Sequence, residues 1–199
     1  MEKSAQRGAG LVRQILGFVH GISGEPRLVQ VKHLLHDVSE IIFQTFPKSI
    51  TLESSIPNDL WLTFANPTQI HQVVMNLASN AAASTAGHAG KLKVVSQAVE
   101  VGPTLAALHP DLRPGRYAQL TVEDNGCGME PALLPRIFDP FFTTKRPGEG
   151  TGLGLSVVHG IVRAHDGAIL VDSKPGVGTC FRLYFPTLNA VEPVRPRLK

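Results

Sequence analysis

The sequence lacks most features that mark secreted, zinc-stabilised or membrane-spanning proteins. It has two cysteines, Cys127 and Cys180, and no Cys-x-x-Cys pair. Their scarcity excludes a disulfide framework and a zinc ribbon, and it suits a reducing cytoplasm. No apolar run approaches the roughly 18 residues that a membrane span needs, and the N-terminus is polar where a secretory signal has its apolar core. We therefore expect a cytoplasmic domain, whose parent protein is either soluble or membrane-anchored.

Charge of one sign is not concentrated either. Lys and Arg number 19 against 16 Asp and Glu, and the bases are scattered except for a small group in the C-terminal tail: Arg195, Arg197 and Lys199. A nucleic-acid-binding protein gathers its bases in a patch with aromatic residues nearby, so we expect no nucleic-acid partner. With 43% hydrophobic residues over 199 positions, the chain is long and apolar enough to form its own core.

Domain boundaries follow from helix breakers and composition near both ends. Residues 3–20 have apolar side chains at helical spacing, and Gly21 and Pro26 then interrupt the pattern. Such a stripe fits packing on the chain's own domain as well as a dimerisation or partner helix. The expected division is a helical segment at 1–24, one domain at 25–187 and a basic, proline-containing tail at 188–199.

The pattern within the central domain predicts an α+β fold. Helical periodicity is found at 34–46, from 67 to a glycine stop at 87–90, and at 151–165. Strand-like runs lie at 28–31, 49–53, 61–64, 91–101, 117–123, 168–171 and 180–185. We expect the second and third runs to pair around a turn, the last two to form a hairpin, and residues 102–115 to be a loop. Because adjacent strands outnumber βαβ units, we predict a two-layer sandwich of a mixed, largely antiparallel sheet with helices on one face, preceded by one helix.

The helix that begins after Asn66 has the clearest signals. Asn66 is a good N-cap, Pro67 suits the first helical position, and Gln69 stands where a capping box has Glu or Gln. Five apolar residues then repeat at core spacing: Ile70, Val73, Val74, Leu77 and Ala81. Asn76 and Asn80 fall at the border of that face. Their amides either reach a cleft or cap loops and point to water.

A glycine-rich stretch leads into the helix at 151–165. Every second residue from Gly148 to Gly154 is glycine. Glycine lets a backbone approach a ligand closely, and a helix N-terminus presents N–H groups to phosphate. The stretch is neither a P-loop nor a dinucleotide fingerprint, and a flexible linker is the alternative. Just before it, Lys145 and Arg146 either neutralise phosphate charge or are solvated loop residues.

Asp124 ends an apolar strand and precedes Asn125 and Gly126. Its carboxylate either closes an Asx-turn or accepts a hydrogen bond from an exocyclic base amine. The second role would select adenine over guanine, which presents a carbonyl oxygen at that position. A polyphosphate normally travels with Mg²⁺, which prefers oxygen ligands. The amide oxygen of Asn80 would serve without adding negative charge.

Five stretches taken together resemble the ATP-binding catalytic domain of bacterial sensor histidine kinases. Residues 72–81 (QVVMNLASNA), 124–129 (DNGCGM), 138–142 (FDPFF), 150–155 (GTGLGL) and 176–179 (GVGT) resemble the N, G1, F, G2 and G3 boxes, in that order. The family belongs to the superfamily of gyrase, heat-shock chaperone and mismatch-repair ATPases, which implies the Bergerat fold, an α/β sandwich with a nucleotide lid. The alanine-rich sequence after Asn80 is similar to the nitrogen-regulation and hybrid subgroup.

The resemblance implies a role for each site residue. Asn80 would bind Mg²⁺, Asn76 and Lys145 would act in catalysis, and Asp124 would accept the adenine amine, with Gly128 giving the base room. The full set expected to bind ATP is Asn76, Asn80, Asp124, Gly126, Gly128, Met129, Phe138, Thr144, Lys145, Gly148, Gly150, Thr151, Gly152, Leu153, Gly154, Leu155 and Thr179.

The resemblance also implies an ATP lid at 129–149. The expected anchor is an aromatic cluster of Phe138, Phe141 and Phe142. This chain departs from the family pattern near the expected adenine site. Many kinases have a lysine and an aromatic residue just after the N box, where this chain has Ala83 and Ser84. Adenine stacking must then come from elsewhere.

No phosphoacceptor box is visible in the sequence. His36 and Asp37 are the nearest His–acid pair, but they lack the basic and Asn-Pro residues that should follow, so we interpret them as coincidence. Residues 11–18 resemble the second helix of a dimerisation hairpin. The implied function is transfer of the ATP γ-phosphoryl group to a histidine outside this chain, in two-component signalling. The hairpin and a downstream response regulator would be the partners, and the full-length protein would dimerise through the N-terminal helix.

Two other functions compete with phosphotransfer. The domain would be a nucleotide-binding regulatory module, or pseudokinase, if it binds ATP without transferring phosphate. An ATPase clamp of the gyrase or chaperone type is less favoured. Those enzymes have a water-activating Glu where this chain has Asn76, and a neutral amide is a poor general base.

Overall fold

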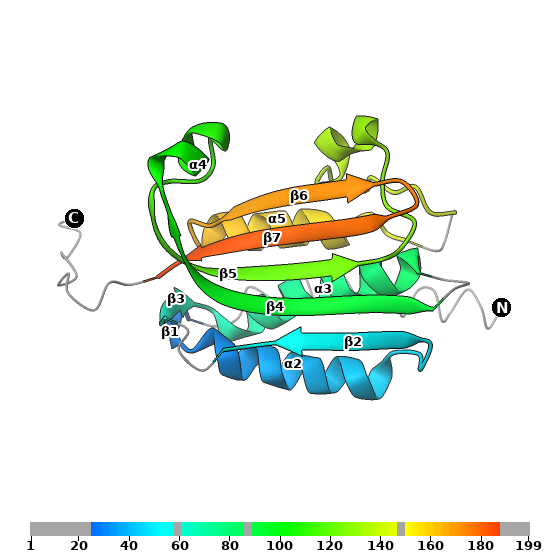
Figure 1. Ribbon diagram of the computed structural model, residues 1–199, viewed down its shortest axis with the longest axis horizontal. Helices are drawn as coiled ribbons and strands as arrows, with labels where there is room; N and C mark the ends of the chain where they lie inside the picture. The colour runs from blue at the N-terminus through cyan, green and yellow to red at the C-terminus, as the bar shows by residue number, and fades with distance from the viewer. Residues whose placement is uncertain (1–24, 58–60, 86–88, 147–149, 188–199) are drawn as a thin grey trace.

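A mixed β-sheet covered on one face by helices forms the body of the computed structural model, which describes residues 25–57, 61–85, 89–146 and 150–187 (Figure 1). The helix expected at 3–20, the tail at 188–199 and Gly148 lie outside these described residues. In chain order the elements are β1 (Arg27–Val29), α2 (Val31–Thr45), β2 (Ile50–Ser55), β3 (Thr63–Ala65), α3 (Pro67–Ser84), β4 (Gly90–Val101), α4 (Pro103–Leu108), β5 (Gly115–Asp124), the 3₁₀ helix η1 (Pro131–Arg136), α5 (Gly154–Ala164), β6 (Ala168–Lys174) and β7 (Gly178–Pro186).

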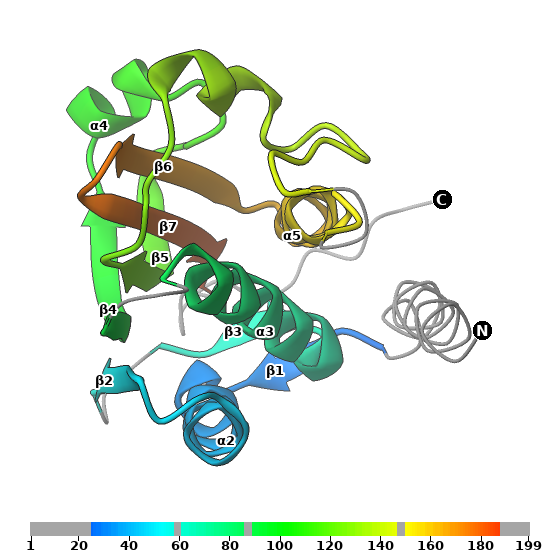
Figure 2. The same ribbon diagram turned by 90° about the vertical axis from the view of Figure 1, so that its right-hand side faces the viewer.

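The main sheet has five strands in the order β2-β4-β5-β7-β6. β2 runs parallel to β4, whereas the other neighbouring pairs are antiparallel. Figure 2 shows α2, α3 and α5 side by side on one face of this sheet, with α3 in the middle. The predicted α+β sandwich is therefore confirmed, as are the two long strands now labelled β4 and β5 and the closing hairpin of β6 and β7. None of the described helices has the length and apolar character to cross a membrane.

Side-chain alternation along β5 decides which residues meet the helices. Ala118, Leu120 and Val122 are buried in the main core, and the residues between them face the other side of the sheet. From α3, the five apolar residues predicted to face the core are all buried: Ile70, Val73, Val74, Leu77 and Ala81. The same alternation places Asp124, two residues beyond Val122, on the helix-facing side at the end of β5.

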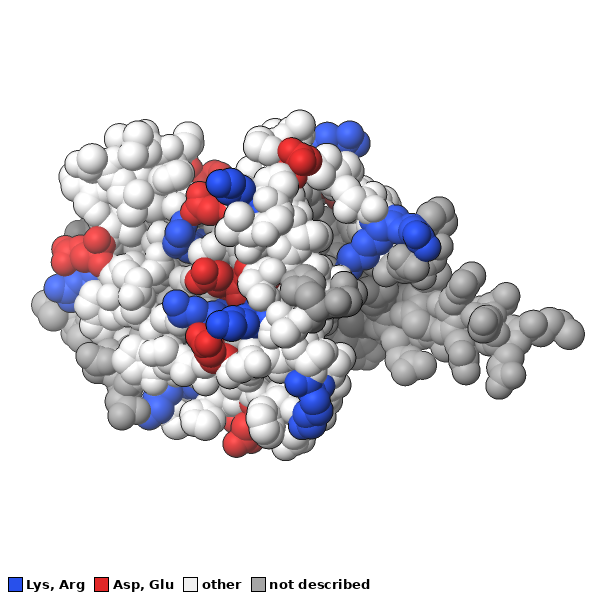
Figure 3. Space-filling view, turned by 45° about the vertical axis from the view of Figure 1, so that its right-hand side comes forward, with Lys and Arg blue, Asp and Glu red and all other residues white. Residues whose placement is uncertain are grey.

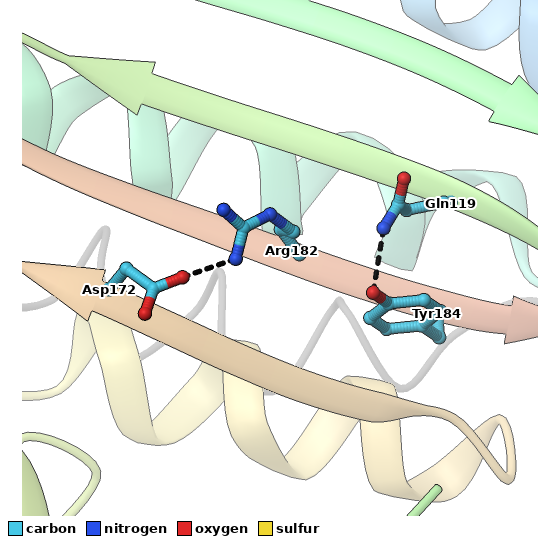
Figure 4. A network of polar contacts seen from close by, with 4 residues as sticks. All are labelled: Gln119, Asp172, Arg182 and Tyr184. Carbon is cyan, nitrogen blue, oxygen red and sulfur yellow. Dashed lines mark hydrogen bonds and ion pairs between the residues drawn. The ribbon is translucent and has the colours of Figure 1, made fainter. Parts of the chain in front are cut away.

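The other face of the sheet carries polar and charged side chains. Gln119 on β5 donates a hydrogen bond from Nε2 to the hydroxyl of Tyr184 on β7 at 2.7 Å, and Arg182 pairs with Asp172 on β6 (Figure 4). Basic and acidic side chains are interspersed over the surface seen in Figure 3. Because Arg182 and Asp172 are solvent-exposed, their ion pair adds little to stability.

The segment 102–115, expected as a loop, contains the short helix α4. Pro103 occupies its first turn, where a missing N–H costs nothing, and Leu and Ala residues follow before Pro110. The many prolines in this segment concealed the helix. Ala106 of α4 packs against a second, smaller core on the sheet face opposite α3, formed by Val101, Leu112, Tyr117, Ala168 and Tyr184.

The predicted pairing of the strands at 49–53 and 61–64 is wrong. β3 pairs antiparallel with β1 in a separate two-stranded sheet, whereas β2 joins β4 in the main sheet. Each segment does form a strand, but strand partners are set by burial and register across the whole fold. The small sheet contributes Val29 and Ala65 to the main core.

Helix ends also differ from expectation. α2 begins at Val31, a residue expected in a strand, and α5 begins at Gly154 rather than at residue 151. After α5 the left-handed residue is Asp166, with φ 53°, rather than the glycine that follows it. Gly167 meets a different constraint, because a Cβ there would lie 2.5 Å from the carbonyl oxygen of Tyr184.

Candidate nucleotide-binding site

Helix α3 forms one wall of the candidate site, and two hydrogen bonds at Asn66 fix its N-terminus. The Asn66 side chain accepts a hydrogen bond from the Thr68 N–H at 3.0 Å, which confirms the predicted N-cap. The N–H of Asn66, which a capping box would give to Gln69, instead donates to His165 Nε2 at 3.0 Å. His165 Nδ1 lies 2.8 Å from the Ile161 carbonyl, so Nδ1 carries the proton. The start of α3 is thus tied to the end of α5.

The glycine-rich stretch meets the middle of α3. A Cβ built on Gly154 would lie 3.8 Å from Asn76 Oδ1 and 3.8 Å from Asn80 Nδ2. Gly154 is the first residue of α5, whose early N–H groups lack helical acceptors and carry partial positive charge. The two asparagines predicted to reach a cleft therefore lie together beside a helix N-terminus that suits phosphate.

Lys145 lies against the same glycine stretch. A Cβ on Gly150 would approach Lys145 Cδ to 3.0 Å and Thr143 Oγ1 to 3.2 Å. The N–H of Lys145 donates to Thr143 Oγ1 at 3.1 Å, which fixes the start of its side chain. Thr144 is exposed beside it, and so is the remainder of the Lys145 side chain. An exposed lysine ammonium whose backbone is held in place fits the predicted contact of Lys145 with phosphate.

The residues around Gly152 complete this end of the site. The N–H of Leu153 lies 3.4 Å from Thr151 Oγ1, so the chain turns just before α5. Leu155 is half-buried and packs against the main core. Thr151 and Leu153 are also half-buried.

The lid predicted at 129–149 contains η1, and two of the three predicted aromatic residues attach it to the domain. Phe138 stacks on His159 of α5, with ring centroids 5.0 Å apart, and Phe142 lies under Arg136 at 4.7 Å. Both pack against the main core. Phe141 differs: it is 74% exposed, so the expected cluster of three is wrong for this residue.

Phe141 holds the lid through its backbone instead. Its φ is 67°, and its N–H donates to the Gly152 carbonyl at 3.0 Å. Gly152 has a φ of 66°, and a Cβ there would overlap the Phe141 carbonyl group. Two residues with left-handed backbones thus contact each other directly, and only glycine fits at position 152.

Asp124 lies at the other end of α3. Its Oδ1 accepts hydrogen bonds from the Gly126 N–H at 2.8 Å and from Ser84 Oγ at 3.0 Å. The Asx-turn considered as an alternative is therefore present, and it leaves Oδ2 out of both bonds. Burial raises the pKa of the Asp124 carboxyl and is opposed by hydrogen bonds from Gly126, Ser84 and the Thr179 backbone. The neighbouring charge of Glu123 raises the pKa slightly further.

The loop after Asp124 is bound tightly to the β6–β7 hairpin. Gly128 has a φ of 65°, and a Cβ there would overlap the Lys174 carbonyl oxygen. The N–H of Met129 donates to Ser173 Oγ at 2.8 Å, and Ser173 Oγ lies 2.9 Å from the hydroxyl of the buried Thr179. Gly128 is thus required for close backbone packing, while its role in giving a base room stays a prediction.

The sequence missed two residues that shape the site. Ser84 was recognised only as a departure from the kinase pattern, yet its hydroxyl contacts Asp124. His165 was counted as the end of a helix, yet it joins α5 to α3. Nothing in local periodicity signals either contact, because the partners lie 40 and 99 positions away in the chain. His36 and Asp37 are exposed on α2, on the other side of α3 from α5.

Comparison with known proteins supports a nucleotide-binding site in this domain. Residues 65–189 match the family model described as "Histidine kinase-, DNA gyrase B-, and HSP90-like ATPase". The sensor kinase CckA of Brucella abortus (strain 2308) is 35% identical over 188 residues, which cover 94% of this chain and 20% of CckA. The sensory histidine kinase/phosphatase NtrB of Rhizobium meliloti (strain 1021) is 33% identical over 158 residues, or 79% of this chain and 41% of NtrB.

A solved structure extends the similarity to three dimensions. Full-length ShkA in complex with AMPPNP superposes with a TM-score of 0.74 at 26% identity, over 97% of this chain and 38% of ShkA. This chain therefore spans a minor part of the length of these relatives. The family model covers more than half of the chain, and the sandwich is the one these kinases share. The chain therefore belongs to the histidine kinase-, DNA gyrase B- and HSP90-like ATPase family and has its ATP-binding Bergerat fold.

Proposed function

We propose that this domain binds Mg²⁺-ATP along α3 and presents its γ-phosphoryl group to a histidine of another segment or chain, as the catalytic domain of a sensor histidine kinase. One observation carries the proposal: Asn76, Asn80 and Gly154 converge at the middle of α3, while Ser84 meets Asp124 at its end. Eight residues of helix separate Asn76 from Ser84, or about 12 Å. That distance suits a nucleotide whose phosphates lie at α5 and whose base lies at Asp124.

Each end of the site has chemistry for one part of ATP. Asp124 accepts the exocyclic amine of adenine and rejects the carbonyl oxygen of guanine. The N-terminus of α5 and Lys145 offset the charge of the phosphates. The lid, held through Phe141 and Gly152, closes over them and limits access of water.

Asn76 favours transfer to an acceptor over hydrolysis. Its neutral amide cannot take a proton from water as a carboxylate would. An acceptor imidazole needs no such help, because its ring nitrogen has a lone pair. That nitrogen bonds to the γ-phosphorus while the bond to the bridging oxygen breaks and ADP leaves. The domain then contributes position and charge neutralisation.

The residues present fit a Mg²⁺ ion carried by the nucleotide. Among the described residues no group of three or more His, Cys, Asp or Glu side chains could hold a metal. Amide oxygens, phosphate oxygens and water are the ligands such a site would offer, and Mg²⁺ accepts this set. Asn80 turns Nδ2 toward Gly154, and a half-turn of the amide presents Oδ1 instead. Bound Mg²⁺ would supply further neutralisation of phosphate charge.

The partners belong to the proposal as well. We infer that residues 1–24 are the remnant of a dimerisation hairpin, that the acceptor histidine lies on that hairpin, and that a response regulator receives the phosphoryl group. A requirement for ATP places the domain in the cytoplasm. The names of CckA and NtrB, a sensor kinase and a sensory histidine kinase/phosphatase, support the assignment of kinase function. Membership of the nitrogen-regulation and hybrid subgroup stays a prediction.

A phosphotransfer assay tests the proposal. The domain is mixed with radiolabelled Mg²⁺-ATP and a separately expressed phosphoacceptor hairpin of the parent protein. We expect acid-labile, base-stable phosphohistidine on the hairpin. Asn80→Ala should slow its formation roughly 100-fold, as loss of an electrostatic contact to the phosphates does elsewhere. Gln44→Ala, which removes an exposed amide from α2, is the matched control and should not change the rate.

Three results would contradict phosphotransfer. Tight ATP binding without phosphohistidine would favour a regulatory nucleotide-binding module. Steady release of phosphate without an acceptor would favour an ATPase clamp. Failure to bind ATP would remove the basis of all these functions.

A further inference from the structure

Ser84 is the last residue of α3 and contacts the loop that follows β5. Its Oγ lies 3.0 Å from Asp124 Oδ1 and 2.8 Å from the Ala81 carbonyl oxygen. A hydroxyl has one hydrogen for these two acceptors. When Asp124 is ionised, the charged acceptor makes the stronger hydrogen bond.

The surrounding backbone fixes Ser84 in this position. The Cys127 N–H donates to the Ser84 carbonyl at 3.1 Å. A Cβ on Gly126 would overlap Ser84 Oγ and lie 2.7 Å from Asp124 Oδ1. Glycine at 126 is therefore what allows the hydroxyl to reach the carboxylate.

We propose that Ser84 is a positioning residue for base recognition: together with the Gly126 N–H it holds Oδ1 of Asp124 and leaves Oδ2 to accept the exocyclic amine of adenine. This inference rests on the proposed function, in which Asp124 contacts the base. A carboxylate rotates freely about its last single bond, and two donors on one oxygen fix its plane. The amine then meets an acceptor that is already oriented.

The hydroxyl also favours the charge state that the amine requires. Burial raises the pKa of Asp124, and the hydrogen bond from Ser84 lowers it. The other groups that bear on this carboxyl are the N–H groups of Gly126 and Thr179 and the carboxylate of Glu123. Loss of the serine hydroxyl should therefore let Asp124 take up a proton at a higher pH.

The competing explanation is a purely structural serine. Serine hydroxyls often bond to a carbonyl one turn earlier in their own helix. Ser39 of α2 does so: its Oγ donates to the Leu35 carbonyl at 2.7 Å, and α2 lies on the other side of α3 from α5. Ser39→Ala therefore removes a similar helical bond without touching the site, which makes it the matched control.

The test compares two ligands on each variant by isothermal titration calorimetry: ATP, and the purine riboside triphosphate that lacks the 6-amino group. Ser84→Ala should weaken ATP binding roughly three- to tenfold. Its affinity for the analogue should stay that of the wild type, because no amine is there to be recognised. The loss of ATP affinity on acidification should begin at a higher pH in Ser84→Ala. Ser39→Ala should change none of these.

Asp124→Asn, measured in the same way, separates the two claims. If Asp124→Asn loses its preference for ATP over the analogue while Ser84→Ala keeps it, the role of Ser84 is overturned and the proposed function stands. Equal weakening of both ligands by Ser84→Ala would show a structural serine and also overturn it. If Asp124→Asn binds ATP like the wild type, the base site itself is misplaced and both proposals fall.

Discussion

At the scale of the residue, Asp124 meets two opposing demands. In the proposed function its carboxylate is ionised when it accepts the adenine amine, yet it is half-buried against α3 at the end of β5. Burial raises its pKa, and donors from Gly126 and Ser84 only partly offset that effect. The ionised form therefore costs stability in the free domain. This is a common property of functional carboxylates.

Asp124→Asn should weaken ATP binding and stabilise the free domain near neutral pH. The loss of affinity should be about 1–3 kcal/mol, because the adenine amine loses its acceptor. The folded pKa lies above the usual value of 3.8. The stability that protonation confers is therefore complete below that value and is lost as the pH rises through the folded pKa. Thermal melts without ligand should show a higher Tm for Asn at pH 7.5 and no advantage at pH 3.5. A lower Tm for the variant at pH 7.5 would contradict the conclusion that burial of the ionised carboxylate costs stability.

At the scale of the element, the first half of the predicted lid is anchored to the core, where Ile137 is buried, and residues 143–146 are exposed. Phe138 and Phe142 pack on the core, while Phe141 points to solvent and bonds to Gly152 through its backbone. Between Phe142 and the glycine stretch, Lys145 and the residue after it are exposed. The exposed part of the lid after Phe142 has few buried contacts and opens at low free-energy cost. The contact with Gly152 should therefore decide how often it opens.

Gly152→Ala should release the lid. Alanine there requires an unfavourable left-handed φ and overlaps the Phe141 carbonyl, so we expect a loss of about 1–3 kcal/mol in local stability. Limited trypsin digestion should cut after Lys145 several times faster, whereas the bond after Arg146 precedes a proline and resists trypsin. The matched control is Gly160→Ala in α5, where a Cβ meets nothing within 4 Å. That change should raise stability by about 0.5–1 kcal/mol. Equal cleavage rates in both variants would show that the Gly152 contact does not hold the lid.

At the scale of the whole molecule, α3 joins the core to the site. It packs against α2, α5 and the sheet through one face. Its border carries Asn76, Asn80 and Ser84, which face α5 and the end of β5. A nucleotide that binds along this border contacts elements of one core. Its binding energy should therefore stabilise the entire domain rather than one loop.

Mg²⁺-ATP should raise the Tm of the wild-type domain. At a free concentration of 100 Kd the gain is about 2.7 kcal/mol, which for a chain of this length is roughly 5–10 °C. In the wild type, chelation of Mg²⁺ should remove part of this Tm shift. Asn80→Ala should already lack that part, whereas Gln44→Ala should keep it. Differential scanning fluorimetry with and without EDTA measures both. An EDTA-sensitive shift of full size in Asn80→Ala would contradict its role as the metal ligand.

Local signals accounted for most elements but not for their partners. The cap at Asn66, the buried face of α3 and the β6–β7 hairpin were predicted because each is a pattern over neighbouring residues. The pairing of β3 with β1, rather than with β2, was not, because strand partners are chosen by the packing of the whole sheet. α4 was missed because the prolines that flank this short helix are equally typical of a loop.

The sequence by itself determined which residues have the chemistry to bind a nucleotide: Asp124, Asn80 and the alternating glycines before α5. It also determined that the domain is an α+β sandwich, since periodicity records which face of each element is buried. Only the tertiary structure decided that Ser84 donates a hydrogen bond to Asp124, that Gly128 packs against a backbone carbonyl and that Phe141 faces solvent. These contacts join residues distant in the chain or depend on backbone handedness. They are set by sheet register and helix packing, which leave no trace in the spacing of neighbouring residues.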